Sequence, residues 1–290
     1  MRKSIIATFL IGVLAWQTFT ASADPVSDRI TVTVRGHGPD VVLIPGLACS
    51  SAVWDATAAH LEGHYRLHIV QVAGFAGSPA HANAQGPVIQ PTVDAIDAYI
   101  KTNQLKAPMI IGHSVGGLMG LMLADQHPED VSRLMIVDSL PFFSVLMGAT
   151  DAAGATPLAA GMRDSILGET QEAYAAGETN ALFSLVKSPA GRQTATAWAV
   201  ASDKSVVARA LYEAMTTDLR PKLHEIKTPI TMLYPWDPLS GMPQAVFDGL
   251  YRDNFAALPN KTIVRIDGSF HFIMLDQPEV FAGQVDAFLK

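Results

Sequence analysis

The sequence predicts an α/β fold in which helices flank a mostly parallel central sheet. Short apolar runs, such as residues 41–44 and 134–137, have the continuous hydrophobicity of strands that are buried on both faces. Segments with helical spacing of apolar residues alternate with these runs along the chain. This alternation of strand and helix is typical of a parallel sheet with crossover helices.

The predicted elements follow one another in a regular order. Strands are expected at residues 30–34, 41–44, 67–72, 109–111, 134–137, 230–234 and 262–266. Helices are expected at residues 51–62, 92–103, 116–127, 243–257 and 277–289. Between residues 140 and 226 the composition changes to Ala, Gly, Thr and charged residues, and no strand pattern is present. We therefore expect a helical cap at 140–226, inserted into a core formed by residues 24–139 and 227–290.

The composition excludes several classes of protein. Of the 290 residues, 49% are hydrophobic and 16% are charged, which is too apolar for a disordered chain. Lys and Arg number 20 against 27 Asp and Glu, so the net charge of −7 gives no basic surface for nucleic acid. Cys49 is the single cysteine, which excludes a disulfide scaffold.

The first 23 residues have the pattern of a secretory signal peptide. A basic start at residues 1–3 precedes an apolar stretch at 5–16, and small residues follow at 21–23. The apolar stretch is shorter than the ~20 residues that a spanning helix needs. We expect cleavage after Ala23 and an exported protein, periplasmic or secreted, with no stable membrane span after cleavage.

The motif that points to chemistry is Gly-His-Ser-Val-Gly at residues 112–116. It follows a predicted strand and opens a predicted helix, which is the placement of a nucleophile elbow. The sharp turn lifts the hydroxyl of Ser114 to the carboxyl edge of the sheet, where open α/β sheets bind ligands. Ser114 is the expected nucleophile. The alternative is a glycine-rich turn with a capping serine.

A serine nucleophile needs a base and an acid, in the chain order Ser, Asp, His. His271 follows the last predicted strand and is the expected base. Asp237 follows the strand at 230–234, and we expect it to orient the ring of His271. Asp138, after the strand at 134–137, is the second candidate for the acid.

The oxyanion that forms during acyl transfer needs two backbone N–H donors. One is expected from Val115, the residue after the nucleophile. The other is expected from Leu47, in the loop after the strand at 41–44. Trp236 and Phe270 flank the expected acid and base, so we expect them to line the substrate pocket, together with Phe142.

The chain resembles the α/β-hydrolase fold superfamily, in the type with a lid between the sixth and seventh strands. The resemblance covers about residues 30–290. It rests on Pro45-Gly46-Leu47, Trp54, the segment 74–78, the segment 112–117, Asp237, and His271 with the segment 275–279 that follows it. It implies Ser114, His271 and Asp237 as a triad, with Leu47 and Val115 as oxyanion donors. One departure is Pro45-Gly46, where many members have His-Gly.

From these residues we expect an exported serine hydrolase that cleaves a carboxylic ester through an acyl-enzyme, with no metal or organic cofactor. The expected partner is a small ester or acyl compound, and a mostly apolar pocket favours uncharged or lipophilic acyl groups. Three alternatives share the fold: a carbon–carbon bond hydrolase, an acyltransferase and a non-catalytic ligand-binding member.

Overall fold

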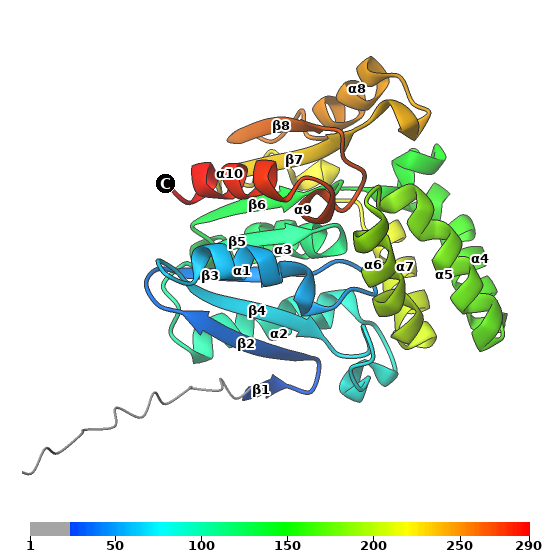
Figure 1. Ribbon diagram of the computed structural model, residues 1–290, viewed down its shortest axis with the longest axis horizontal. Helices are drawn as coiled ribbons and strands as arrows, with labels where there is room; N and C mark the ends of the chain where they lie inside the picture. Colours follow the sequence, from blue (N-terminus) through cyan, green and yellow to red (C-terminus); the bar gives the residue numbers. More distant parts are fainter. Residues whose placement is uncertain (1–23) are drawn as a thin grey trace, which may run out of the picture.

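The computed structural model describes residues 24–290, so the signal peptide expected at 1–23 lies outside the described residues. An eight-stranded sheet forms the centre of the molecule, in the order β1-β2-β4-β3-β5-β6-β7-β8 (Figure 1). The pairs β1–β2 and β2–β4 are antiparallel, and every other neighbouring pair is parallel. The strands are β1 (Asp24–Ser27), β2 (Ile30–Gly36), β3 (Asp40–Ile44), β4 (Arg66–Val72), β5 (Met109–His113), β6 (Arg133–Val137), β7 (Ile230–Trp236) and β8 (Lys261–Asp267).

Helices cover both faces of this sheet. The helices α1 and α10 lie together on one face, whereas α2 and α3 lie together on the other (Figure 1). The core helices are α1 (Asp55–Leu61), α2 (Ile89–Thr102), α3 (Val115–Gln126), α8 (Gln244–Asn254), α9 (Ile273–Asp276) and α10 (Pro278–Leu289). Short 3-10 turns are η1 (Ser51–Trp54), η2 (His81–Ala84), η3 (Pro128–Asp130), η4 (Phe143–Met147), η5 (Arg220–Lys222) and η6 (Pro238–Ser240).

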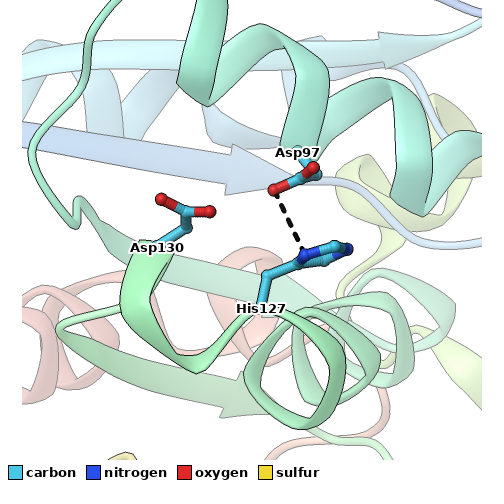
Figure 2. A group of neighbouring side chains, drawn as sticks. All are labelled: Asp97, His127 and Asp130. Atoms are coloured by element: carbon cyan, nitrogen blue, oxygen red, sulfur yellow. Dashed lines mark ion pairs between the residues drawn. The ribbon is translucent and has the colours of Figure 1, made fainter.

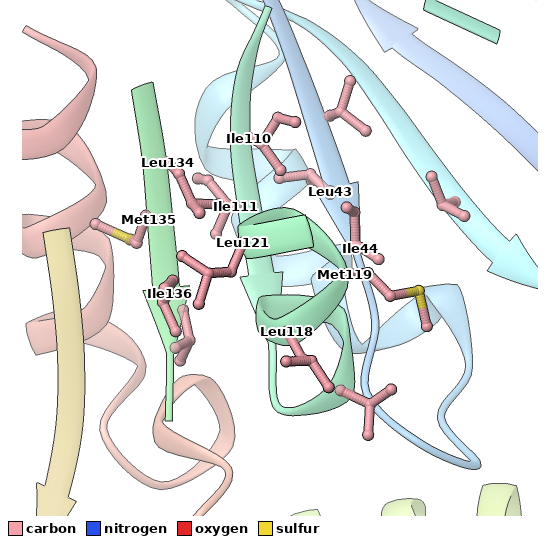
Figure 3. Close-up of a cluster of buried hydrophobic side chains, with 14 of the residues drawn as sticks. Leu43, Ile44, Ile110, Ile111, Leu118, Met119, Leu121, Leu134, Met135 and Ile136 are labelled. Carbon is pink, nitrogen blue, oxygen red and sulfur yellow. The ribbon is translucent and has the colours of Figure 1, made fainter. Parts of the chain in front are cut away.

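The central core is built where α3 packs on the middle strands (Figure 3). β3, β5 and β6 are buried on both faces, which explains why their sequences are continuously apolar. Each fully buried Leu or Ile contributes about 1.5–3 kcal/mol to folding. The labelled side chains of this cluster are Leu43, Ile44, Ile110, Ile111, Leu118, Met119, Leu121, Leu134, Met135 and Ile136.

Four helices stand between β6 and β7 in the chain, and we call them the cap. They are α4 (Ala152–Gly168), α5 (Gln171–Leu185), α6 (Pro189–Ala201) and α7 (Lys204–Thr216). α4 packs against α7, and α5 packs against α6. The two pairs lie together beyond one edge of the sheet layers (Figure 1).

The predicted fold class is confirmed, but one strand is added and several strand ends shift by one or two residues. The strand β1 is not predicted, because its four residues, Asp-Pro-Val-Ser, have no run of apolar or β-branched residues. The strand β7 continues to Trp236, two residues beyond the predicted end. This second difference changes the position of Asp237.

Candidate active site

Ser114 occupies a strained turn between β5 and α3. Its φ of 54° and ψ of −124° lie in a region that residues other than glycine rarely adopt. The turn is held in place because the N–H of Ser114 donates to the carbonyl of Val137 at 2.9 Å, at the end of the neighbouring strand. The backbone conformation is the one expected of a nucleophile elbow.

Two glycines allow this turn to form. A Cβ on Gly112 would lie 2.3 Å from the carbonyl oxygen of Gly116, and a Cβ on Gly116 would lie 2.4 Å from that of Ile44. Both contacts involve backbone atoms, which no side-chain rotation can relieve. The close approach of α3, β5 and the end of β3 therefore requires glycine at both positions.

The loop after β3 passes directly beside Ser114. A Cβ on Gly46 would lie 3.1 Å from the Cβ of Ser114, so the Pro45-Gly46 turn brings the chain against the serine. Leu47 lines the same cavity as Ser114. The N–H of Val115 stands in the first turn of α3, where backbone donors have no partner within the helix. Both expected oxyanion donors thus stand near the serine.

His271 lies in the loop after β8, and its ring contacts Asp138. The Nδ1 atom of His271 is 2.5 Å from Oδ2 of Asp138, which is nine-tenths buried. The hydroxyl of Tyr251, on α8, donates to the other oxygen of Asp138. Burial and the charge of Asp138 raise the pKa of Tyr251 well above its usual value, so this hydroxyl keeps its proton. Both oxygens of Asp138 are therefore bonded, one to the ring and one to the phenol.

The structure corrects the sequence-based assignment of the acid, because Asp237 does not pair with His271. Its carboxylate is 2.6 Å from Nζ of Lys187, which comes from the loop between α5 and α6. The N–H of Leu239 donates to the same carboxylate at 2.8 Å. Burial opposes the ionisation of Asp237, but these donors outweigh it, and the pKa of Asp237 is lowered.

The register of the sheet explains this correction. Val137 at the end of β6 pairs with Leu233 of β7, and the N–H of Asp138 donates to the carbonyl of Leu233 at 2.8 Å. Asp237 comes four residues after Leu233, whereas Asp138 follows Val137 directly. At about 3.3 Å per residue, Asp237 is carried roughly 10 Å further along the sheet than Asp138.

Ser114 and His271 line one cavity of about 150 Å³ beneath the cap. Apolar side chains of the cap and of the core form most of its wall, which matches the expectation of an apolar pocket. The full lining is Leu47, Ala48, Cys49, His113, Ser114, Glu178, Leu182, Leu185, Ala195, Ala199, Val207, His271 and Phe272. Burial raises the pKa of Cys49 to about 12, so its thiol stays protonated.

A second cavity, of about 200 Å³, lies on the Asp138 side of His271. Trp236 and Phe270, two of the predicted pocket residues, line this second cavity and not the one with Ser114. Phe142, the third residue predicted to line the pocket, lines neither cavity. Its side chain is fully buried, and the Arg220 guanidinium lies 4.4 Å from the centre of its ring.

His113 and Tyr251 are two site residues that sequence reasoning missed. The Nε2–H of His113 donates to the backbone carbonyl of His271 at 3.1 Å, and the two rings lie 4.6 Å apart. Burial, first, and the nearby ring of His271 lower the pKa of His113 far below its ordinary value of 6.5, so it is neutral. His113 could have been identified from its position inside the motif at residues 112–116, whereas no local sequence pattern points to Tyr251.

Among residues 24–290, one cluster away from Ser114 has the side chains of a metal site. It joins Asp97 of α2 with His127 and Asp130 beyond the end of α3 (Figure 2). α3 begins at the nucleophile and spans about 18 Å over its 12 residues, so the cluster is remote from the site. Lys101 lies 2.8 Å from Asp97 and 3.5 Å from Asp130, and this ammonium compensates both carboxylates. Ion pairing accounts for the cluster.

Within the described part of the chain, no helix combines the length and the apolar character that crossing a membrane requires.

Comparisons with known proteins place these features in a family. A model of the alpha/beta hydrolase family matches residues 41–284. The chain is 28% identical over 274 residues to the pimeloyl-[acyl-carrier protein] methyl ester esterase of Vibrio atlanticus (strain LGP32), covering 91% of this chain and 100% of that protein. It is also 28% identical over 261 residues to the esterase of the same name from Vibrio cholerae serotype O1, covering 88% and 96%.

Solved structures with low sequence identity share the fold. A hydrolase from Pseudomonas aeruginosa PA01 matches with a TM-score of 0.74 and 18% identity, covering 94% of this chain and 99% of that one. The enol-lactonase from Burkholderia xenovorans LB400 matches with a TM-score of 0.73 and 20% identity, covering 90% and 96%. The chain therefore belongs to the alpha/beta hydrolase family, which confirms the fold and the hydrolase class expected from its sequence.

Proposed function

We propose that this chain is a serine hydrolase that cleaves a carboxylic ester through Ser114, His271 and Asp138. The proposal rests on one observation, which is the arrangement of these three residues. A serine on a strained elbow and the histidine of a 2.5 Å His–Asp pair line the same apolar cavity. The relatives named above are esterases, which supports an ester over other acyl compounds.

The reaction divides into two halves that use the same groups. Ser114 attacks the ester carbonyl while Nε2 of His271 takes its proton, and the backbone N–H groups of Leu47 and Val115 stabilise the oxyanion. Asp138 holds the Nδ1–H of the ring and stabilises the imidazolium. The alcohol leaves with the proton from His271. Water, deprotonated by His271, then releases the acid and restores Ser114.

Intact mass after treatment with a fluorophosphonate tests this proposal. The reagent forms a bond from phosphorus to Oγ of an activated serine and loses fluoride. We expect one adduct on the folded protein and none on Ser114→Ala. A folded wild-type protein without an adduct, or an adduct that persists in Ser114→Ala, would overturn the proposal.

Substrate turnover separates the remaining reactions of this fold. Short methyl and p-nitrophenyl esters test ester hydrolysis. The methyl ester of a medium-chain acyl group is the first choice, because the relatives are named as esterases of a pimeloyl methyl ester. A vinylogous diketone tests carbon–carbon hydrolysis, and an added alcohol or amine acceptor tests acyl transfer. We expect esters to be hydrolysed fastest, and preferential turnover of either other substrate class would replace the ester assignment.

A further inference from the structure

One face of the cap helix α5 is directed toward the core and carries a carboxylate. Tyr174, Glu178, Leu182 and Leu185 follow one another at intervals of four, four and three residues, so they share one side of the helix. Tyr174 and Leu182 are buried, with 1% and 4% of their surface exposed. Glu178 is half-buried and lines the cavity that holds Ser114 and His271. A charged side chain thus interrupts an apolar stripe at the active site.

Within residues 24–290, no hydrogen bond or ion pair holds the carboxyl of Glu178. The nearby phenol of Tyr174 bonds instead to the carbonyl of Ala199 at 3.3 Å. Burial, and to a smaller extent the charge of Glu169, raise the pKa of Glu178. A partly buried carboxylate without a donor is unfavourable, and a donor on a bound molecule would relieve that penalty.

The rest of the cavity leaves room for such a donor. Ala195 and Ala199 of α6 present only methyl groups to the same space. Glu178 is the one carboxylate among the described residues that line this cavity, and no Lys or Arg lines it. The site therefore offers a single carboxylate, with no Lys or Arg of its own to neutralise it.

We propose that Glu178 selects esters whose portion inside this cavity carries a primary ammonium group. This inference rests on the proposed ester hydrolysis and narrows its substrate class. A primary ammonium is a compact cation with three donors, so it can bond the carboxylate directly. A carboxylate on the substrate would meet a like charge across a partly desolvated gap and be rejected. The substrate class is thus aminoacyl or aminoalkyl esters, in place of the purely lipophilic esters that the apolar wall alone favours.

Matched ester pairs test this selection on either side of the scissile bond. Methyl 6-aminohexanoate and methyl heptanoate differ by an ammonium in place of a methyl group on the acyl side. The acetates of 5-aminopentanol and hexanol make the same exchange on the alcohol side. At about pH 8 the amines are protonated. We expect kcat/KM to favour the ammonium member of at least one pair, and monomethyl adipate to be the poorest substrate.

Glu178→Gln removes the charge and keeps the size of the side chain. It should lower the ratio of kcat/KM for the ammonium ester to kcat/KM for its uncharged partner by about tenfold, which is the effect of one charge-assisted hydrogen bond. It should also improve turnover of monomethyl adipate. Glu172→Gln is the matched control, since Glu172 lies on the same helix but does not line the cavity, and it should change neither ratio.

Two failures can be told apart in this design. If methyl heptanoate and hexyl acetate are hydrolysed and Glu178→Gln leaves both ratios unchanged, the selection by Glu178 is wrong and the esterase proposal stands. If no ester of the set is hydrolysed by a folded wild-type protein, the proposed function itself fails.

Discussion

Asp138 bonds both His271 and Tyr251, so its carboxylate is the group that we expect to orient the base. Replacing Asp138 with Asn should lower kcat by roughly 10³–10⁴-fold, because the ring would then adopt the wrong tautomer. Asp237→Asn should change kcat by less than about tenfold, since its partner is Lys187. Initial rates with a short ester measure both effects, and circular dichroism checks folding. The opposite ranking would return the acid to Asp237.

His113 makes the stability of the protein sensitive to acid. Its pKa is depressed in the folded state, so below pH 6.5 the unfolded chain binds a proton that the folded chain does not. The contribution of neutral His113 to the free energy of unfolding is complete above pH 6.5. It is lost as the pH falls, by up to about 1.4 kcal/mol per pH unit.

His113→Gln keeps an N–H donor for the carbonyl of His271 and removes this titration. We expect the free energy of unfolding to depend less steeply on pH between about 5 and 6.5 in this variant, as measured by urea denaturation. An unchanged slope would mean that His113 is protonated in the folded protein. His68 is also buried with a lowered pKa, and its contribution should persist in both proteins.

At the scale of elements, the contact between α3 and the end of β3 tolerates no side chain at Gly116. Gly116→Ala should lower the free energy of unfolding by about 3 kcal/mol or more, because a Cβ there meets the carbonyl of Ile44. Urea denaturation measures this loss. Equal stability of the variant and the wild type would contradict the close approach of α3 to the sheet.

Gly161→Ala is the matched control for that substitution. Gly161 lies in the middle of the cap helix α4 and is exposed, and a Cβ at this position would extend into open space. The same chemical change should there raise stability by about 0.5–1 kcal/mol, because alanine favours the helix more than glycine does.

The cap is fastened to the core at the loop between α5 and α6. The backbone N–H groups of Lys187 and Ser188 both donate to Asp276, and the side chain of Lys187 reaches Asp237 and the carbonyl of Gly268. Asp237 is therefore part of the junction between cap and core. This junction lies at the end of α5, the helix that carries Glu178.

At the scale of the whole molecule, we propose that residues 1–23 direct export and are removed. When the full chain is expressed in a bacterium with two membranes, the periplasmic fraction or the medium should contain a protein that begins at Asp24, as shown by intact mass. Leu10→Arg interrupts the apolar stretch and should leave the uncleaved chain in the cytoplasm. Recovery of the uncleaved wild-type chain from the cytoplasm alone would contradict export.

The parts of the fold that the sequence predicts are those encoded by a pattern within a short stretch of residues. The strands β3, β5 and β6 are continuously apolar because both of their faces are buried, and this pattern is legible in the sequence. The strand β1 has no such pattern, and it is defined by its pairing with β2. Ser114 and its glycines were legible for the same reason, since the elbow is a property of five consecutive residues.

The assignment of Asp138 as the proposed acid and the proposed role of Glu178 both depended on the tertiary structure. Asp138 and Asp237 each follow a strand, and only the register of β6 against β7 decides which carboxylate stands level with His271. Glu178 faces the site because α5 packs with one particular side toward the core. The sequence by itself determined the fold class and the candidates Ser114 and His271, because strand burial and the elbow are encoded over a few residues. Strand register and helix rotation are determined by contacts between distant segments, so only the tertiary structure showed that Asp138 contacts His271 and that Glu178 lines the cavity.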